Sequence, residues 1–428
     1  MLEAGGRAAH RPAATLFVLA TVLLDMLAVA IVIPVLPRLV LDLLHGDTVR
    51  AAGVIGVFGT AWALMQFVFS PVQGALSDRF GRRPVILLSN LGLGLDYLLM
   101  ALAPGIGLLL LGRVISGITA ASISTAGAYV ADISPPERRA AGFGLISVAI
   151  GVGFVAGPAL GGVLGALDPR LPFWVASGLS LLNAGYGFLV LPESLPLSRR
   201  APFSWRRANP VGALGLLRSR PALLGLSAVN FLALLAQGSL TAVFVLYGTY
   251  RYGWDQRTVG LTLAAIGVCS AAVGGLLVQR VVHSLGERLA LLLGLAAGSA
   301  GFLLFGLART QWGFWAGVPL LGVWGLASPA AQALMSRQVP GTEQGRLQGA
   351  SSSLMGLAGL FAPSLFTALF AHGIAAASWR MPGAPFLVAA LLLAGAALLA
   401  VRVAPGAQPA AVARTLRPGA PPLDPAKG

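Results

Sequence analysis

Three ionisable side chains lie inside long apolar runs of this sequence. Asp25 lies in LLDMLAVAIVIPVLP, Asp96 in LGLDYLLMAL and Arg113 in LLGRVISGIT. A charge inside a bilayer is costly unless it is paired or faces water, so such residues usually carry function. Two acids and one base leave at least one carboxylate without an obvious intramembrane partner, and such a group could take up and release a proton. We therefore predict that these three residues handle protons; the alternative is a static Asp-Arg pair that only holds helices together.

The runs that hold these residues predict membrane-spanning helices. The chain has 428 residues, of which 57% are hydrophobic and 10% are charged, whereas about a quarter of the residues of a soluble domain are charged. A helix of about 20 apolar residues crosses the hydrocarbon core of a bilayer. Runs long enough to do so are expected near 14–36, 53–73, 84–103, 107–130, 140–165, 171–192, 222–249, 257–280, 289–307, 312–335, 346–371 and 383–402.

These runs form two sets of six, which predicts an all-α membrane protein with twelve transmembrane helices in two pseudo-symmetric six-helix bundles. The first bundle is expected at residues 1–192 and the second at 222–402. Residues 193–221 are rich in arginine and should form a cytoplasmic central loop, and the Ala- and Pro-rich residues 403–428 a disordered cytoplasmic tail. A weak internal echo supports duplication, since GALSDRFGRRP after the second run resembles HSLGER after the eighth.

The placement of the basic residues predicts the orientation of the chain. The net charge of +15 could suggest a nucleic-acid binder, but the arginines lie in short loops between apolar runs. With a cytoplasmic N-terminus, the inner segments carry roughly three times as many Lys and Arg as the outer loops, which is the positive-inside pattern. We therefore expect a multi-pass protein of the inner membrane with both termini in the cytoplasm and no nucleic-acid partner.

One motif lies between the second and third runs. It reads GALSDRFGRRPV, Gly74 to Val85. Its glycines permit a tight turn, its acid can accept hydrogen bonds at a helix N-terminus, and its bases can bridge to acids or lipid phosphates. The residues in these three roles are Gly74 and Gly81, Asp78, and Arg79, Arg82 and Arg83.

This motif resembles the signature of the major facilitator superfamily, and the match is nearly complete. In that family the loop latches the two halves together when the cytoplasmic side is closed. The resemblance implies that Asp78 then meets the start of the eleventh span, near Gly345 and Arg346. The alternative is a solvated loop that only anchors the helices.

A second motif, GFVAGPALGG, lies in the fifth run and resembles the motif that marks the antiporters of the superfamily. Its glycines allow helices to approach closely, and its proline bends the span and removes a backbone donor. The residues concerned are Gly153, Gly157, Pro158, Gly161 and Gly162. The alternative is generic packing of small residues, since glycine is plentiful in this chain.

A narrower resemblance covers roughly residues 15 to 400. The segments quoted above, together with WALMQFVFSPVQ, AVFVLYGTYRYGW, ASPAAQALMSRQV and GRLQGASSSL, look like the bacterial tetracycline/proton antiporters and their close relatives. The resemblance implies that Asp25, Asp96 and Arg113 are needed for transport and that Gln66 lies in the cavity.

Two positions depart from that pattern. Tetracycline carriers usually have a histidine in span eight and an aspartate in span nine, both tied to proton coupling. This chain has Ser270 at the first position and Gly298 or a neighbour at the second. Coupling is therefore expected to depend on the first half, and the identity of the substrate stays open.

Polar side chains in the apolar runs are candidates for hydrogen bonds to a substrate. We predict this role for Gln66, Asn230 and Gln237, although each could equally bond another helix. Aromatic side chains such as Phe244, Tyr247 and Trp324 could form a cavity wall for a flat apolar solute; the alternative is that they face lipid or lie at the membrane interface.

These observations together predict a secondary active transporter that exports a drug-like molecule, tetracycline-type or otherwise hydrophobic, in exchange for protons by alternating access. An alternative keeps the fold and changes the cargo to a sugar, metabolite or siderophore. The four histidines are scattered and no nucleophilic or nucleotide-binding constellation is visible, so neither an enzyme nor a cofactor or metal site is expected. The expected partners are a small molecule, protons and the bilayer, with the protein as a monomer.

Overall fold

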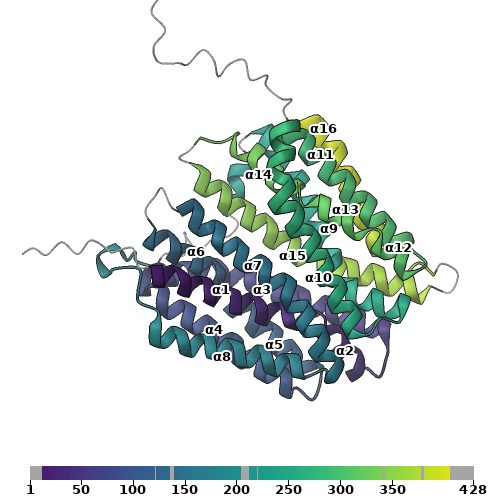
Figure 1. Ribbon diagram of the computed structural model, residues 1–428, viewed down its shortest axis with the longest axis horizontal. Helices are drawn as coiled ribbons and strands as arrows, with labels where there is room; N and C mark the ends of the chain where they lie inside the picture. The colour runs from purple at the N-terminus through teal and green to yellow at the C-terminus, as the bar shows by residue number, and fades with distance from the viewer. Residues whose placement is uncertain are drawn as a thin grey trace, which may run out of the picture.

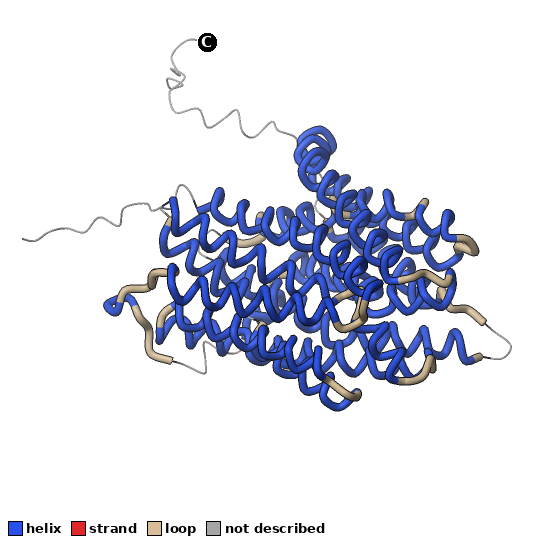
Figure 2. Tube along the Cα trace, turned by 60° about the horizontal axis from the view of Figure 1, so that its bottom comes forward, coloured by secondary structure: helices blue, strands red, loops and turns tan. Residues whose placement is uncertain are grey.

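The computed structural model describes residues 12–120, 122–134, 139–203, 212–218, 220–340, 343–376 and 380–404. Within these ranges the chain consists of helices joined by turns and loops, with no strand (Figure 2). The predicted all-α class is therefore confirmed. Residues 405–428, which include nearly all of the predicted tail, lie outside the described residues.

The first part of the chain folds into one group of packed helices. Its members are α1 (Pro12–Val32), α2 (Leu36–Leu43), α3 (Thr48–Phe80), α4 (Arg82–Leu102), α5 (Ile106–Thr119), α6 (Ser122–Ile133), α7 (Arg139–Leu167) and α8 (Leu171–Val190). Two short 3₁₀ helices, Leu197–Arg199 and Gly212–Arg218, follow them.

The second part forms another group, which lies beside the first (Figure 1). Its members are α9 (Pro221–Tyr252), α10 (Gln256–Ala272), a π-helical turn (Val273–Leu277), α11 (Val278–Leu307), α12 (Gln311–Trp315), α13 (Val318–Trp324), α14 (Ala327–Ser336), α15 (Gln344–Ala375) and α16 (Ala384–Val403).

Ten helical stretches among the described residues are long and apolar enough to cross a membrane. The longest, Gln256–Leu307, is interrupted at Gly286, whose φ of 80° and ψ of 165° are not helical. The predicted runs near 257–280 and 289–307 lie on the two sides of this break. A shorter apolar helix, Ile106–Thr119, is followed closely by α6 in the place of the fourth predicted run. The number of twelve spans and the side on which the termini lie stay predictions.

Gly286 has a structural counterpart in the first half. Gly81, between α3 and α4, has a φ of 107° and a ψ of 161°, so both glycines place a left-handed residue at the junction between the second and third long helices of their half. Only glycine adopts such angles without strain. The echo between GALSDRFGRRP and HSLGER therefore corresponds to one backbone geometry that is used twice.

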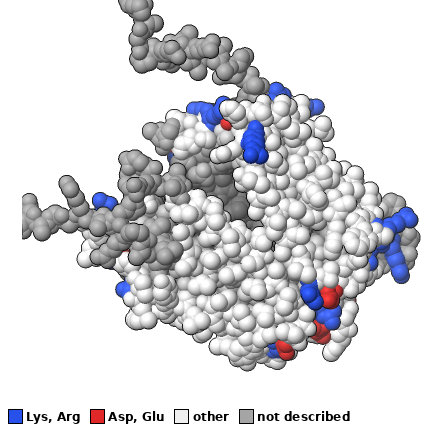
Figure 3. Space-filling view, in the orientation of Figure 1, with Lys and Arg blue, Asp and Glu red and all other residues white. Residues whose placement is uncertain are grey.

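The two groups of helices contact each other near one end and separate toward the other. On one side Thr60 of α3 and Ser364 of α15 share a hydrogen bond of 2.8 Å between their hydroxyls. On the other side α7 packs against α10, from Gly162 opposite Gln256 to Val155 opposite Gly267. Toward the opposite end, marked by α6 and α14, the groups diverge (Figure 1), and the surface is hollowed between them (Figure 3). We call the first the closed end and the second the open end.

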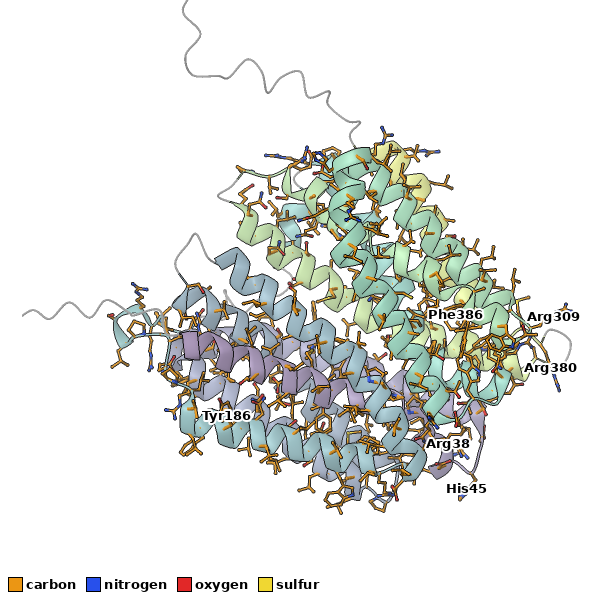
Figure 4. All side chains as sticks on the ribbon, in the orientation of Figure 1. Arg38, His45, Tyr186, Arg309, Arg380 and Phe386 are labelled. Atoms are coloured by element: carbon orange, nitrogen blue, oxygen red, sulfur yellow. The ribbon has the colours of Figure 1, made fainter. Side chains whose placement is uncertain are left out.

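The outer surface suits a bilayer. Charged side chains gather near the two ends of the helices, and the face between them is uncharged (Figure 3). Large apolar side chains are exposed on it, such as Leu182 at 70% and Leu391 at 71%. Arg38, His45, Arg309 and Arg380, from loops predicted to lie outside, share the closed end, whereas Tyr186 lies toward the other end (Figure 4). Exposed apolar area of this extent marks a surface that contacts lipid or protein.

An aromatic cluster forms the core of the second group near the closed end. The rings of Phe305 and Phe314 stack with their centroids 3.7 Å apart, and the hydroxyl of Tyr247 donates to the carbonyl oxygen of Phe305 at 2.9 Å. Phe244 and Tyr247 are each 1% exposed. Neither expectation holds for these two aromatics: they are buried away from lipid and do not line the cavity described below, and they pack within the protein instead.

Candidate functional site

Asp25 lies in a fully buried polar cluster between α1, α4 and α8. The side-chain nitrogen of Asn183 donates to Oδ1 of Asp25 at 3.1 Å and to the carbonyl oxygen of Thr21 at 3.1 Å. The hydrogen-bonding network turns the Asn90 amide so that its nitrogen lies 3.0 Å and 3.2 Å from the two carboxylate oxygens. Asp25, Asn90 and Asn183 are each at most 1% exposed. The carboxylate is therefore held by two amides and lies inside the first group of helices.

Asp96 and Arg113 form an ion pair between α4 and α5. Oδ2 of Asp96 lies 3.8 Å from Nη2 of Arg113, with the acid side chain 0% exposed and the base 15% exposed. The same arginine nitrogen donates to the sulfur of Met100 at 3.3 Å. Neither carboxylate oxygen of Asp96 meets strict hydrogen-bond geometry in the described part of the chain, but the hydroxyl of Ser116 on α5 is close enough to interact with the acid. The 3.8 Å separation describes a loosely held pair.

Tyr97 lies on α4 next to Asp96 and is 2% exposed. It is within electrostatic range of Arg113, Asp96 and Asp25. The three residues predicted to handle protons therefore lie at two neighbouring sites in the first half of the protein.

The signature loop is organised around Gly81 and Glu193. The carboxylate of Glu193 accepts the backbone N–H of Arg82 at 2.8 Å and that of Arg83 at 3.3 Å, at the start of α4. Exposed backbone N–H groups at a helix N-terminus favour an anionic partner. A side chain at position 81 would collide with this carboxylate, whose carbon lies 2.6 Å from the place of a Cβ. Position 81 therefore requires glycine for two reasons: its backbone angles, and the room that the Glu193 carboxylate needs to cap α4.

Arg82 ties the loop to its own half of the protein. Its Nε lies 3.1 Å from Oδ2 of Asp132 on α6, and its Nη1 lies 2.6 Å from Oδ1 of Asp78. Arg83 donates to the carbonyl oxygen of Phe188 at 2.6 Å. The loop thus joins α3, α4, α6 and α8 at the open end.

Two expectations for this loop are corrected. Gly74 lies inside α3 with open space beside it, so it makes no turn. Asp78 lies in the last turn of α3, where it pairs with Arg82, and Glu193 provides the cap that was expected from Asp78. Arg79 lies over the ring of Phe80 at 5.0 Å.

The expected contact of Asp78 with the start of the eleventh span is not seen among the described residues, where Asp78 pairs with Arg82. In this structure Arg346 pairs with Glu343 at 2.8 Å, and the helix groups are apart at this end. The latch across Gly345 and Arg346 stays a prediction.

The glycine motif in α7 packs two neighbours at once. Gly153, Gly157 and Gly161 face α1 at Met26, Ala30 and Ile31, with no room for a Cβ. Gly162, one position further, faces α10, where a Cβ would lie 2.5 Å from the carbonyl oxygen of Gln256. The carbonyl oxygen of Pro158 also contacts α10 at Gly260. The motif therefore joins the two halves at the closed end.

A cavity of about 290 Å³ lies in the second half. No charged residue lines it, and its polar groups are amides and hydroxyls beside one indole ring. Those side chains are Asn230, Gln237, Ser270, Ser328 and Trp324. A pocket that is mostly apolar with a few fixed polar groups is the usual form of a small-molecule site.

The three predicted substrate-binding residues are not all brought together. Asn230 and Gln237 line the cavity, whereas Gln66 does not. Gln66 is half-buried on α3 next to Phe67, whose ring lies against Gly356 of α15. Gln66 therefore lies near a contact between the two halves.

The structure explains the departure at Gly298. A Cβ there would lie 2.7 Å from Cγ of Trp324 and 2.8 Å from Cδ1 of Leu393. The indole of Trp324 thus fills the room that an acidic side chain on α11 would need, while Ser270 presents a neutral group to the cavity.

Sequence reasoning missed Asn90, Asn183, Asp132 and Glu193. The two asparagines carried the same signal as Asn230, an amide inside an apolar run, and could have been found by it. Asp132 and Glu193 gave no such signal because they lie at the ends of runs, where charges are common.

No group of three His, Cys, Asp or Glu side chains is placed to hold a metal ion anywhere in the described ranges. Cys269, the single cysteine, is partly buried beside Gly322.

Comparison with known proteins gives the family. The sequence profile of the Major Facilitator Superfamily matches residues 18–363 and 252–424. Over 379 residues the chain is 39% identical to the tetracycline resistance protein, class C, of Escherichia coli, which covers 89% of this chain and 94% of the relative. It is 38% identical over 372 residues to the class G protein of Vibrio anguillarum, covering 86% of this chain and 92% of the relative.

A solved structure of similar fold is the human organic anion transporter TETRAN. The alignment has a TM-score of 0.68 and 26% identity and covers 91% of this chain and 100% of that protein. The D-xylose-proton symporter, at 18% identity and a TM-score of 0.71, shares the fold. On the sequence profile and these relatives together, the chain belongs to the major facilitator superfamily.

Proposed function

We propose that this protein is a secondary active transporter that exports a drug-like small molecule in exchange for protons. The observation that carries the proposal is the presence of buried Asp25 and of the Asp96-Arg113 pair in one half, together with an uncharged cavity in the other. The names of the class C and class G relatives support efflux of a tetracycline-type or other hydrophobic compound. We propose no enzymatic activity and no cofactor, with the proton gradient as the energy source.

In this scheme the structure corresponds to the inward-facing state. The open end carries the signature loop and the arginine-rich central segment, so the positive-inside rule places it in the cytoplasm. We propose a monomer in the inner membrane with twelve spans and both termini in the cytoplasm. The two six-helix bundles rock about the closed contacts of α3 with α15 and of α7 with α10.

The proton step depends on the ion pair being loosely held. Protonation of Asp96 removes its attraction to Arg113 and frees the guanidinium, which can then reach another partner. A proton taken from the outer side and released to the cytoplasm would link this change to the alternation of the bundles.

The cavity favours an uncharged substrate, or an uncharged part of one. Amides and hydroxyls satisfy neutral donors and acceptors, and Trp324 offers a face for a flat ring, while a net charge would enter without a counter-ion. A sugar, metabolite or siderophore on the same fold is the alternative. The indole of Trp324 and the apolar lining favour a drug-like compound with a flat aromatic ring over these alternatives.

The test uses everted vesicles from cells that lack their main efflux pumps. Substrate addition should release protons from energised vesicles that contain the protein, and Asp25→Asn should abolish this release while membrane insertion is unchanged. Asp42→Asn, which alters an exposed carboxylate paired with Arg38, is the matched control and should behave as the wild type. Unimpaired transport by Asp25→Asn would refute the proposal.

A further inference from the structure

Asp25 is surrounded by amides, whereas Asp96 faces a guanidinium. Asn90 and Asn183 come from α4 and α8 and reach the same carboxylate on α1. Both are at most 1% exposed. A buried amide with no function is costly to keep, because each of its polar atoms must find a partner.

The present arrangement fits the ionised carboxylate. An ionised carboxylate accepts hydrogen bonds only, and here Oδ1 receives Asn183 Nδ2 at 3.1 Å and the Asn90 nitrogen at 3.0 Å. The oxygen of Asn90 also lies 3.1 Å from the nitrogen of Asn183, so the two hydrogens of that nitrogen are shared among three acceptors. Hydrogen bonds to a charged group are the stronger kind.

The same residues can also serve the protonated carboxyl. When a proton binds Asp25, one oxygen becomes a donor and needs an acceptor. Half a turn of the Asn90 amide presents its carbonyl oxygen to that hydroxyl and its nitrogen to Asn183. Oδ1 of Asn183 is buried with no hydrogen-bond partner among the described residues, so a matching turn of the Asn183 amide lets this oxygen accept from the Asn90 nitrogen. A leucine of similar size would offer neither.

We propose that Asn90 and Asn183 are positioning residues for Asp25, and that rotation of the Asn90 amide accompanies the binding and release of its proton. The proton adds to a carboxylate oxygen, and the new O–H donates to the amide oxygen; release reverses both changes. This inference rests on the proposed proton-coupled function. It assigns to two amides in the first half the role of reorienting when Asp25 gains or loses a proton.

Other titratable groups near this site are few. They are Asp96 and Tyr97 on α4 and Arg113 on α5, which interact through Tyr97. On the other helices packed against α1, the titratable side chains that the structure describes are Tyr129 and Asp132 on α6 and Tyr186 on α8. Asp132 lies near the end of its helix, and Tyr186 is exposed. The amides of Asn90 and Asn183 contact Asp25 directly and are groups that its protonation state can reorient.

The first experiment uses the wild-type protein in lipid nanodiscs with isotope-labelled asparagine. Infrared difference spectra between low and high pH should show the Asp25 carboxyl band together with a change in an asparagine amide band. Both should vanish in Asp25→Asn. A carboxyl band that appears without any asparagine change, or the absence of an Asp25 band, overturns the inference.

The second experiment compares variants of Asn90. Asn90→Leu should move the midpoint of the Asp25 band upward by about one pH unit or more, since a hydrogen bond to the charged form is lost. Asn90→Ser keeps a group that both donates and accepts and should lie closer to the wild type. Ser180→Ala removes a buried hydroxyl of α8 that has no partner among the described residues and should change nothing. A folded Asn90→Leu protein with the wild-type midpoint contradicts the inference.

These readouts separate the inference from the proposed function. The infrared bands report on Asp25 and the amides whether or not substrate moves. If both bands titrate while vesicles show no substrate-linked proton movement, antiport fails and the amide assignment stands. If antiport is found but the asparagine bands are silent, the assignment fails alone.

Discussion

Arg82 and Glu287 occupy equivalent positions in the two halves and carry opposite charges. Each follows the left-handed glycine of its half, and each pairs with a residue 50 positions away, Arg82 with Asp132 at 3.1 Å and Glu287 with Arg337 at 2.6 Å. The next residue in each half donates to a backbone carbonyl near the end of the last helix of that half. Arg83 donates to Phe188 of α8 at 2.6 Å, and Arg288 donates to Val401 of α16 at 2.7 Å. The repeat therefore preserves the contact while the signs of its charges are exchanged.

The two pairs should differ in strength. Arg82 is 11% exposed and also contacts Asp78 and Ser77, so Arg82→Met should lower the free energy of unfolding by about 1.5–3 kcal/mol. Glu287 is 14% exposed, but its partner Arg337 is 71% exposed and screened by solvent, and glutamine keeps a hydrogen-bond acceptor, so Glu287→Gln should cost only about 0–1 kcal/mol. Thermal unfolding of both variants in the same detergent checks this order, and an equal or larger loss for Glu287→Gln would contradict it.

Two glycines of the signature loop should respond in opposite ways to alanine. Gly81→Ala places a Cβ at a positive φ and against Glu193, so we expect a loss of more than about 1 kcal/mol. Gly74→Ala adds a methyl group in open space inside α3 and should be neutral or stabilising by up to about 1 kcal/mol. The pair is measured by unfolding temperature, with Gly74→Ala as the matched control. Tolerance of alanine at both positions would show that the cap does not constrain the loop.

Asp255 should make stability at the closed end depend on pH. Its carboxylate accepts the backbone N–H of Thr258 at 2.8 Å at the start of α10, and the hydrogen bonds from Thr258 lower the pKa of Asp255. Because the folded pKa lies below the unfolded one, the stabilisation is present above the unfolded pKa, near 3.9, and is lost as the pH falls through the folded pKa.

Two substitutions separate the cap from its charge. Asp255→Ala should cost about 0.5–2 kcal/mol at neutral pH through the loss of the cap. Asp255→Asn keeps a capping oxygen, so it should remove only the part of the free energy of unfolding that changes with pH in the acid range. Unfolding measured from neutral pH down to acid distinguishes the three proteins, and identical acid profiles for Asp255 and Asp255→Asn would refute the assignment.

The departure at Gly298 should be coupled to Trp324. Gly298→Asp forces a side chain against the indole and against Leu393, so overpacking of about 1–3 kcal/mol is expected. Gly298→Asp combined with Trp324→Ala restores the room and should recover most of that loss. Unfolding of the two single variants and the double variant forms a thermodynamic cycle. Strict additivity would mean that the two side chains do not compete for space.

Much of the architecture could be predicted from apolar runs. A helix in a bilayer forms its backbone hydrogen bonds within its own segment, so its presence can be predicted from that segment alone. The break at Gly286 shows the limit of this reasoning. Runs 257–280 and 289–307 were separated correctly by the polar turn between them, whereas the π-helical turn at Val273–Leu277 left no compositional mark.

The amino-acid sequence by itself determined the helical class, the family resemblance and the presence of Asp25, Asp96 and Arg113 in apolar surroundings, since hydropathy and residue identity are local properties. Only the tertiary structure decided which partner each charge has. Asp25 is held by Asn90 and Asn183, and Asp96 faces Arg113, because helices α1, α4, α5 and α8 come together at those positions. Contacts between side chains far apart in the chain depend on how the helices cross, and the sequence of a single apolar run does not determine this crossing.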